Sequence, residues 1–72
     1  MKYDNKQVGE RIKSIRHSMK MTQAVLAEKT ELHDTFISRI ETGKRRASIN
    51  SLVKIKSVLN TSLDYIVLGE KN

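Results

Sequence analysis

Apolar residues recur at helical spacing near the start of the chain. Val8, Ile12, Ile15 and Met19 are separated by four, three and four positions, which places their side chains on one stripe of an α-helix. The pattern predicts a first helix from about Lys6 to Met19.

A second, shorter pattern follows. Thr22 stands where a helix N-cap is expected, because its hydroxyl can accept a hydrogen bond from the free amides of a new helix. Leu26 and Ala27 would face inward, and we expect this helix to end near Thr30.

A third helix is predicted from about Asp34 to Thr42, because Gly43 occupies the position at which a left-handed residue commonly ends a helix. At about 100° per residue, polar side chains fall on one half of this cylinder and apolar ones on the other. The polar half is expected to be free to face a partner. Its members are Asp34, Thr35, Ser38, Arg39 and Thr42, and the apolar half holds Phe36, Ile37 and Ile40.

Two further helices complete the pattern. Ser48 can cap a fourth helix, and Ser62 can cap a short fifth helix that Gly69 closes. The alternation typical of strands is missing. We therefore predict an all-α fold of five helices in a single domain over residues 1–72, with fraying ends at residues 1–5 and 70–72. The expected inward residues of the last two helices are Leu52, Ile55, Leu59, Leu63 and Ile66.

Charge favours a polyanionic partner. The 72 residues include 14 Lys and Arg against 8 Asp and Glu, giving a formal charge of +6 and a pI near 9.9. An inert basic surface could have the same total, but the distribution is uneven. Between residues 42 and 63 the charged residues are Lys44, Arg45, Arg46, Lys54 and Lys56, with no carboxylate among them.

Several classes of function find no support in the composition. The chain has no cysteine, and His17 and His33 stand far apart with no companion cluster, so we expect no metal, no cofactor and no enzymatic activity. No apolar run resembles a signal peptide or approaches the roughly 20 residues that span a bilayer. The expected location is therefore the cytoplasm, with no membrane partner.

The segments VGERIKSIRHSMKMTQAVLAEK, ISRIETGKR and SLVKIKSVLNTSLDYIVLG, in this order, resemble the Cro/repressor-type (XRE-like, lambda-repressor-like) helix-turn-helix family. The resemblance implies a compact five-helix fold with the helix-turn-helix at about residues 22–42. It also implies a sequence-specific regulator of transcription, encoded by a bacterium or phage. Such proteins commonly bind a palindromic operator in double-stranded DNA as a homodimer and act as repressors or activators.

The resemblance also implies roles for individual residues. Thr22 and Gln23 would contact a phosphate, although Thr22 could be a cap only. Asp34 could instead complement the helix dipole, Arg39 could bind phosphate, and His33 could be a weak N-cap or a phosphate contact. The positions that read bases are His33, Asp34, Thr35, Ser38 and Arg39, and further phosphate contacts fall on Thr42, Lys44, Arg45 and Arg46.

In the family, an arginine of the first helix pairs with the glutamate of the IE-x-G stretch under the recognition helix, which here implies a salt bridge between Arg16 and Glu41. Tyr65, Val67 and Leu68 give the last helix more apolar surface than so short an element buries by itself. These three residues are expected to form either a dimer interface or an ordinary part of the core.

The chain departs from the family pattern at three positions. Glu31 stands where the turn often has glycine, so either the turn is adjusted or a strained conformation is accepted. Thr30 replaces an apolar residue, and Phe36 could pack against the second helix or reach a sugar or thymine methyl. An alternative function is an antitoxin-like module that binds DNA but mainly holds an unidentified protein partner.

Overall fold

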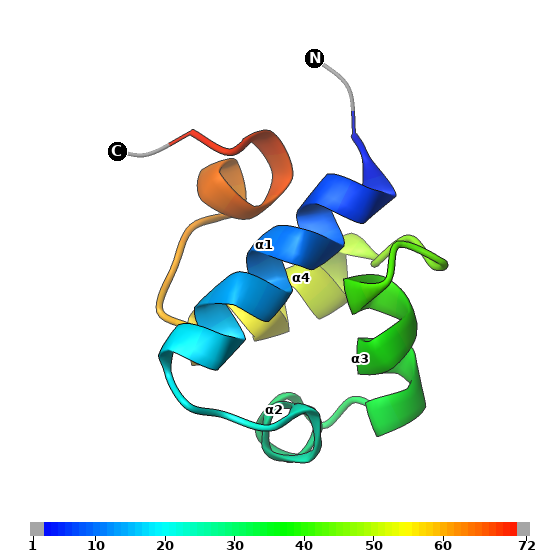
Figure 1. Ribbon diagram of the computed structural model, residues 1–72, viewed down its shortest axis with the longest axis vertical. Coiled ribbons are helices and arrows are strands. Elements are labelled where there is room, and N and C mark those ends of the chain that lie inside the picture. The colour runs from blue at the N-terminus through cyan, green and yellow to red at the C-terminus, as the bar shows by residue number, and fades with distance from the viewer. Residues whose placement is uncertain (1–2, 71–72) are drawn as a thin grey trace.

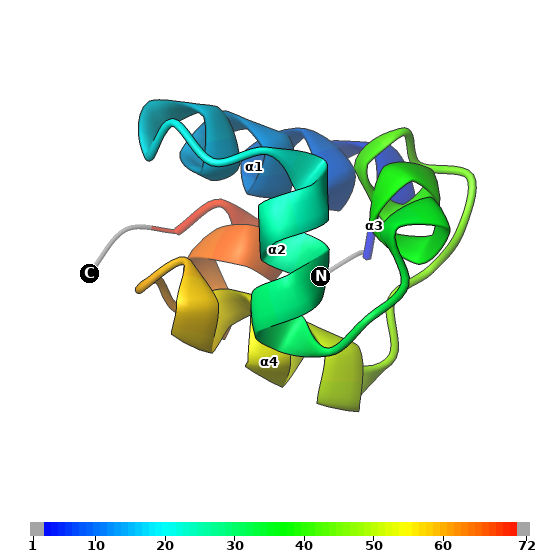
Figure 2. The ribbon, with the colours of Figure 1, turned by 90° about the horizontal axis from the view of Figure 1, so that it is seen from below.

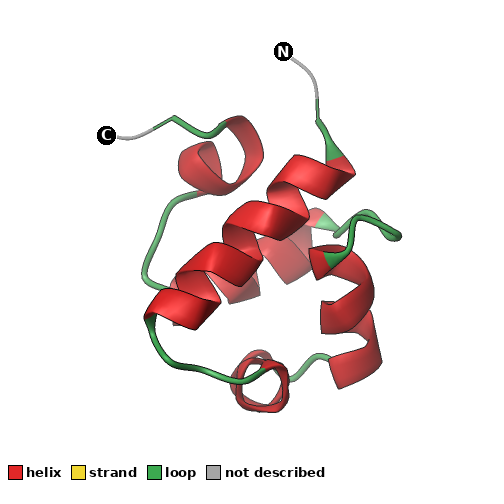
Figure 3. Cartoon of the chain, viewed as in Figure 1, coloured by secondary structure: helices red, strands yellow, loops and turns green. Residues whose placement is uncertain are grey.

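The computed structural model describes residues 3–70, and Figure 3 shows helices and loops without a strand over that range. In Figure 1, α1 crosses the middle of the molecule, with α4 behind it and α3 to one side. Figure 2 shows α2 spanning the distance between α1 and α4. The predicted all-α architecture is confirmed. The elements are α1 (Asn5–Ser18), α2 (Gln23–Thr30), α3 (Asp34–Glu41), α4 (Ile49–Val58) and a single π-helical turn, η1 (Asp64–Leu68).

Side-chain caps determine where the helices begin. The Thr22 and Ser48 hydroxyls each accept a hydrogen bond from the amide three residues later, at 3.1 Å, which confirms both as caps. Asp4 caps α1 by accepting from two amides at 2.9 and 3.1 Å. The prediction that the whole of residues 1–5 frays is therefore wrong for its last two positions. Residues 1–2 and 71–72 lie outside the described part of the chain.

The core is built from apolar residues of every element. Its buried members include those expected inside α2 and α4. Met19 is a correction, because its side chain is 43% exposed although it continues the apolar stripe of α1. The helix ends at Ser18, so Met19 lies past the last helical turn. The buried apolar residues are Val8, Ile12, Leu26, Ala27, Ile37, Ile40, Ala47, Leu52, Ile55, Leu59 and Ile66.

The backbones of α1 and α3 touch at Gly9. A Cβ atom at this position would clash with the Ile40 carbonyl oxygen and would lie 2.7 Å from the Glu41 carbonyl oxygen. Only glycine permits so close an approach. The position of α3 is thus fixed by direct backbone contact with the longest helix of the described chain.

The turn between α2 and α3 accepts a strained residue. Glu31 has φ = 61°, in the left-handed region that glycine occupies without penalty. The turn is therefore not adjusted to avoid this conformation. Thr30, just before it, is buried where the family pattern has an apolar residue, and its hydroxyl donates to the Leu26 carbonyl at 2.7 Å. Burial of this polar side chain costs little because its hydrogen bond is made.

The last element is a π-helical turn and not the predicted α-helix. Ser62 accepts from the amide of Tyr65 at 3.1 Å, and Gly69 ends the element with φ = 76°, as expected, but the turn between them is π-helical. The Arg11 side chain donates to two carbonyls of this turn, those of residues 66 and 67, at 3.1 Å each. These bonds satisfy carbonyls that a longer α-helix would have paired. Leu63 is half-buried against the core.

Candidate nucleic-acid interface

The two faces of α3 differ as the rotation predicts. Ile37 and Ile40 are buried in the core, whereas Asp34, Thr35 and Arg39 are exposed. Ser38 is half-buried and Phe36 packs partly against the core. The polar half of α3 is therefore open to a partner over its whole length.

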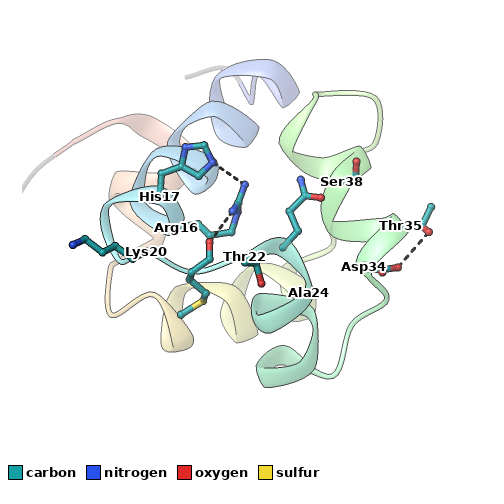
Figure 4. Close-up of a pocket in the computed structure, with 10 residues that line it drawn as sticks. Arg16, His17, Lys20, Thr22, Ala24, Asp34, Thr35 and Ser38 are labelled. Carbon is teal, nitrogen blue, oxygen red and sulfur yellow. Dashed lines mark hydrogen bonds between the residues drawn. The ribbon is translucent and has the colours of Figure 1, made fainter.

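A hollow of about 730 Å³ lies between the end of α1, the start of α2 and the outer face of α3 (Figure 4). It brings together two groups of residues that the resemblance assigns to DNA. Thr22 and Gln23 lie on the α2 side, and Asp34, Thr35 and Ser38 lie on the α3 side. Part of each expected group thus borders the same surface. The predicted residues that do not line the hollow are His33, Arg39, Thr42, Lys44, Arg45 and Arg46.

A buried charged network lies beneath this hollow. Arg16 Nε and Nη2 donate to the two carboxylate oxygens of Glu41 at 2.7 and 2.9 Å, and Arg16 Nη1 donates to the Met21 carbonyl at 2.7 Å. The Arg16 and Glu41 side chains are only 7% and 1% exposed. Because α1 contributes the arginine and α3 the glutamate, the pair fastens these two helices to each other.

Gln23 belongs to the same network, which the sequence did not indicate. Its Nε2 donates one of its two hydrogens to Glu41 Oε1 at 3.0 Å. The two residues are 18 positions apart, and no local pattern connects them. The first backbone amides of α2 have no acceptor within the helix.

The N-terminus of α3 has no side-chain cap. His33 occupies the N-cap position, but its side chain makes no capping hydrogen bond. Its Nδ1 lies 3.3 Å from Oδ1 of Asp34, and both side chains are largely exposed. Both residues therefore stay accessible at the end of α3 that borders the hollow.

The loop after α3 presents its cations beside aromatic rings. The Arg45 guanidinium lies 5.2 Å from the centroid of Phe36, and that of Arg46 lies 4.0 Å from the centroid of Tyr3. The Arg45 amide also donates to the Arg39 carbonyl at 3.2 Å, so the loop begins attached to the end of α3. The family pattern did not point to Tyr3, and charge alone did not indicate these ring contacts.

The most exposed large apolar side chain of the described residues belongs to α4. Ile49 is 68% exposed and Val53, one turn later, is 40% exposed. The residues expected at a dimer interface are half-buried and therefore less exposed than Ile49. They are Tyr65, Val67 and Leu68. The sequence analysis did not predict this exposed apolar pair. The signal for it is the spacing of four positions between Ile49 and Val53, which places them outside the inward stripe of α4.

Other kinds of site find no support in the part of the chain that the structure describes. Over residues 3–70, no three acidic, histidine or cysteine side chains come together in a group that could hold a metal ion. Within the same range, no helix has the length and hydropathy needed to cross a membrane.

Residues 12–66 match the family model described as helix-turn-helix (HTH_3). The chain belongs to the Cro/repressor-type helix-turn-helix DNA-binding family. Members of this family are regulators of transcription and not enzymes.

Individual members show the same relationship. The chain is 38% identical over 64 residues to the immunity repressor protein of Bacillus phage phi105, covering 89% of this chain and 44% of the phage protein. It therefore spans less than half the length of that repressor. It is 36% identical over 66 residues to control protein C.BamHI of Bacillus amyloliquefaciens, covering 85% of this chain and 82% of the control protein.

A solved helix-turn-helix structure supports the fold. The P22 c2 repressor, crystallised with a synthetic operator, superposes with a TM-score of 0.85 at 28% identity. The alignment covers 90% of this chain and 98% of the repressor chain. The arrangement of α2 and α3 is thus that of a helix-turn-helix protein, and the resemblance inferred from the sequence is confirmed.

Proposed function

We propose that this chain reads a specific DNA sequence as a homodimer on a palindromic operator, with α3 in the major groove, and acts as a repressor or autoregulator in the cytoplasm. The observation that carries the proposal is the common surface formed by the outer face of α3 and the start of α2. Helix-turn-helix proteins insert the second helix into the major groove while the preceding helix contacts the backbone. The operator-bound P22 c2 repressor supports this orientation by similarity.

The chemistry of the α3 face suits base reading. Arg39 can offer two parallel donors to guanine, Thr35 can donate, accept or contact a thymine methyl, and Asp34 can accept from cytosine. All three side chains are exposed. Lys44, Arg45 and Arg46 follow directly after α3, where cations would add sequence-independent affinity through contacts with phosphates.

Selection from random duplex DNA tests sequence reading. We expect the wild-type chain to retain a palindromic motif, and Arg39→Ala and Thr35→Ala to change the preferred base at their own positions. Loss of one good side-chain contact costs about 1–3 kcal/mol of discrimination. Lys54→Ala is the matched control, because it removes an exposed cation from α4 without touching α3. Retention without any motif would contradict the proposal.

The homodimer has its own support in the apolar surface of α4. Ile49 and Val53 are exposed, and Ile49 borders a second hollow of about 370 Å³ that Tyr3, Leu52 and Val67 also line. We infer that this surface, together with the expected Val67, forms the two-fold contact. Burial of Ile49 alone would contribute about 1.5–3 kcal/mol on each side.

Sedimentation equilibrium tests the interface. We expect Ile49→Lys to shift the chain toward monomers and to weaken operator binding, since two half-sites would no longer be bound together. Met19→Lys is the control for the association constant, because Met19 is also exposed and apolar but follows α1 and does not belong to α4. An unchanged association constant for Ile49→Lys would place the interface elsewhere.

A further inference from the structure

His17 lies beside the hollow at the end of α1, and neither the family resemblance nor the proposed function gives it a role. Its Nε2 is 3.2 Å from Nη2 of Arg16 (Figure 4). Because a guanidinium can only donate, the imidazole must accept this hydrogen bond through an unprotonated Nε2. A protonated imidazole carries a hydrogen on both nitrogens and cannot accept.

Arg16 itself is already committed. Its guanidinium is held by the Glu41 carboxylate and the Met21 carbonyl, and its positive charge is balanced by Glu41. It is therefore poorly placed to serve as a phosphate ligand. His17, in contrast, is exposed, so its ring can turn toward a ligand.

We propose that His17 is a DNA-backbone ligand whose contact depends on its protonation. The protonated imidazole turns a donor away from Arg16 and toward a phosphate of the strand that passes Thr22 and Gln23. The charge of the phosphate offsets the repulsion between the imidazolium and Arg16. The inference rests on the proposed function, because it concerns the same hollow.

The charges around His17 are few. On its own side, Lys13 lies one turn earlier and Lys20 follows α1, with its side chain directed away from α3 in Figure 4. The start of α2 contributes only neutral side chains to the hollow, and α3 contributes Asp34 across it and Glu41 beneath it. Protonation adds a positive charge to the imidazole, whereas DNA phosphates stay ionised. Affinity for DNA should therefore rise as pH falls.

Fluorescence anisotropy with a duplex tests the inference at about pH 6 and about pH 8, over about 50 to 200 mM salt. One additional phosphate contact per half-site adds two contacts for a dimer and steepens the salt dependence by about 1.8, which makes the loss of affinity across that range about twelvefold larger. We expect this increase for the wild-type chain at the lower pH. His17→Gln should abolish it, since glutamine can still accept from Arg16 but cannot become charged. His17→Lys should show the steeper slope at both pH values.

Two control variants separate this effect from others. His33→Gln removes the other histidine of the chain, and the pH response that remains in this variant is the part that His17 can supply. Lys54→Gln removes an exposed charge of α4 and should leave the slope unchanged at both pH values.

Several outcomes would overturn the inference. One is a pH response that persists in His17→Gln, and another is equal weakening of that variant at both pH values, which would indicate a structural role. His17→Lys binding no better than His17→Gln would have the same meaning. The proposed function fails separately, if no motif is selected from random DNA. The pH test still decides the role of His17 with any duplex, because a phosphate contact does not depend on sequence, and absence of all DNA binding would refute both.

Discussion

Replacement of Arg16 by methionine isolates the energetic role of the buried network. The substitution removes both bonds to Glu41 and leaves its carboxylate, 1% exposed in the folded protein, with Gln23 as its remaining side-chain donor. Removing one partner of a buried ion pair typically costs about 3–5 kcal/mol. For a domain of this size, 1 kcal/mol lowers the melting temperature by about 4–8 °C, so we expect a drop of at least about 12 °C.

The double variant Arg16→Met/Glu41→Leu distinguishes an unpaired charge from lost packing. When both charged groups are replaced by apolar residues of similar volume, no buried charge remains, and such replacements are often neutral or stabilising. We therefore expect the double variant to be more stable than Arg16→Met by about 2 kcal/mol or more. Lys54→Met is the matched control, because it makes the same kind of exchange at an exposed position and should change stability by less than about 0.5 kcal/mol.

Urea unfolding followed by circular dichroism gives the four free energies of the double-mutant cycle. Additive effects of the two substitutions would refute the reasoning, because they would show that Arg16 and Glu41 do not depend on each other. A loss below about 1 kcal/mol for Arg16→Met would refute it as well.

Three further predictions concern packing, strain and the basic loop. Gly9→Ala should lower the free energy of unfolding by at least about 1–3 kcal/mol, since the new Cβ meets backbone oxygens of α3, and chemical denaturation measures the loss. Glu31→Gly should raise the melting temperature measured by circular dichroism, because relief of the left-handed strain is worth up to about 1 kcal/mol. Phe36→Leu should weaken DNA binding in anisotropy titrations by less than about tenfold, and only when Arg45 is present, because the ring holds that guanidinium in place.

Each of these three predictions has a comparison variant or a result that would contradict it. Asn60→Gly relieves a similar left-handed residue, with φ = 55°, but should gain less than Glu31→Gly because asparagine tolerates this conformation. Equal gains would contradict the strain argument. If Phe36→Leu weakens binding equally in an Arg45→Ala background, the ring contacts DNA directly and does not act through the arginine. Gly9→Ala with unchanged stability would mean that α1 and α3 can move apart without cost.

The helices could be predicted because their signals are local. The capping hydroxyls of Thr22 and Ser48 act three residues away, and the two faces of α3 follow from its own rotation. The family motifs then identified the helix-turn-helix family, which the family model over residues 12–66 confirms. Where local signals were incomplete, boundaries shifted, as at Asp4, which extends α1 toward the N-terminus.

Interactions between distant segments could not be predicted from single residues. The bond from Gln23 to Glu41 depends on how α2 and α3 cross, and the π-helical turn depends on the Arg11 side chain of α1. Exposure of Ile49 depends on which neighbours cover the start of α4. Such features arise from tertiary packing, which hydrophobic periodicity does not encode.

The division of α3 into two independent faces has an evolutionary consequence. Ile37 and Ile40 hold the helix against the rest of the protein, while Thr35 and Arg39 face outward. Substitutions at exposed positions usually change stability by less than about 0.5 kcal/mol. Under the proposed reading of DNA by α3, a descendant of this chain could therefore acquire a new target sequence through a few outward changes while keeping the same scaffold. The same separation makes α3 a suitable place for laboratory redesign of DNA preference.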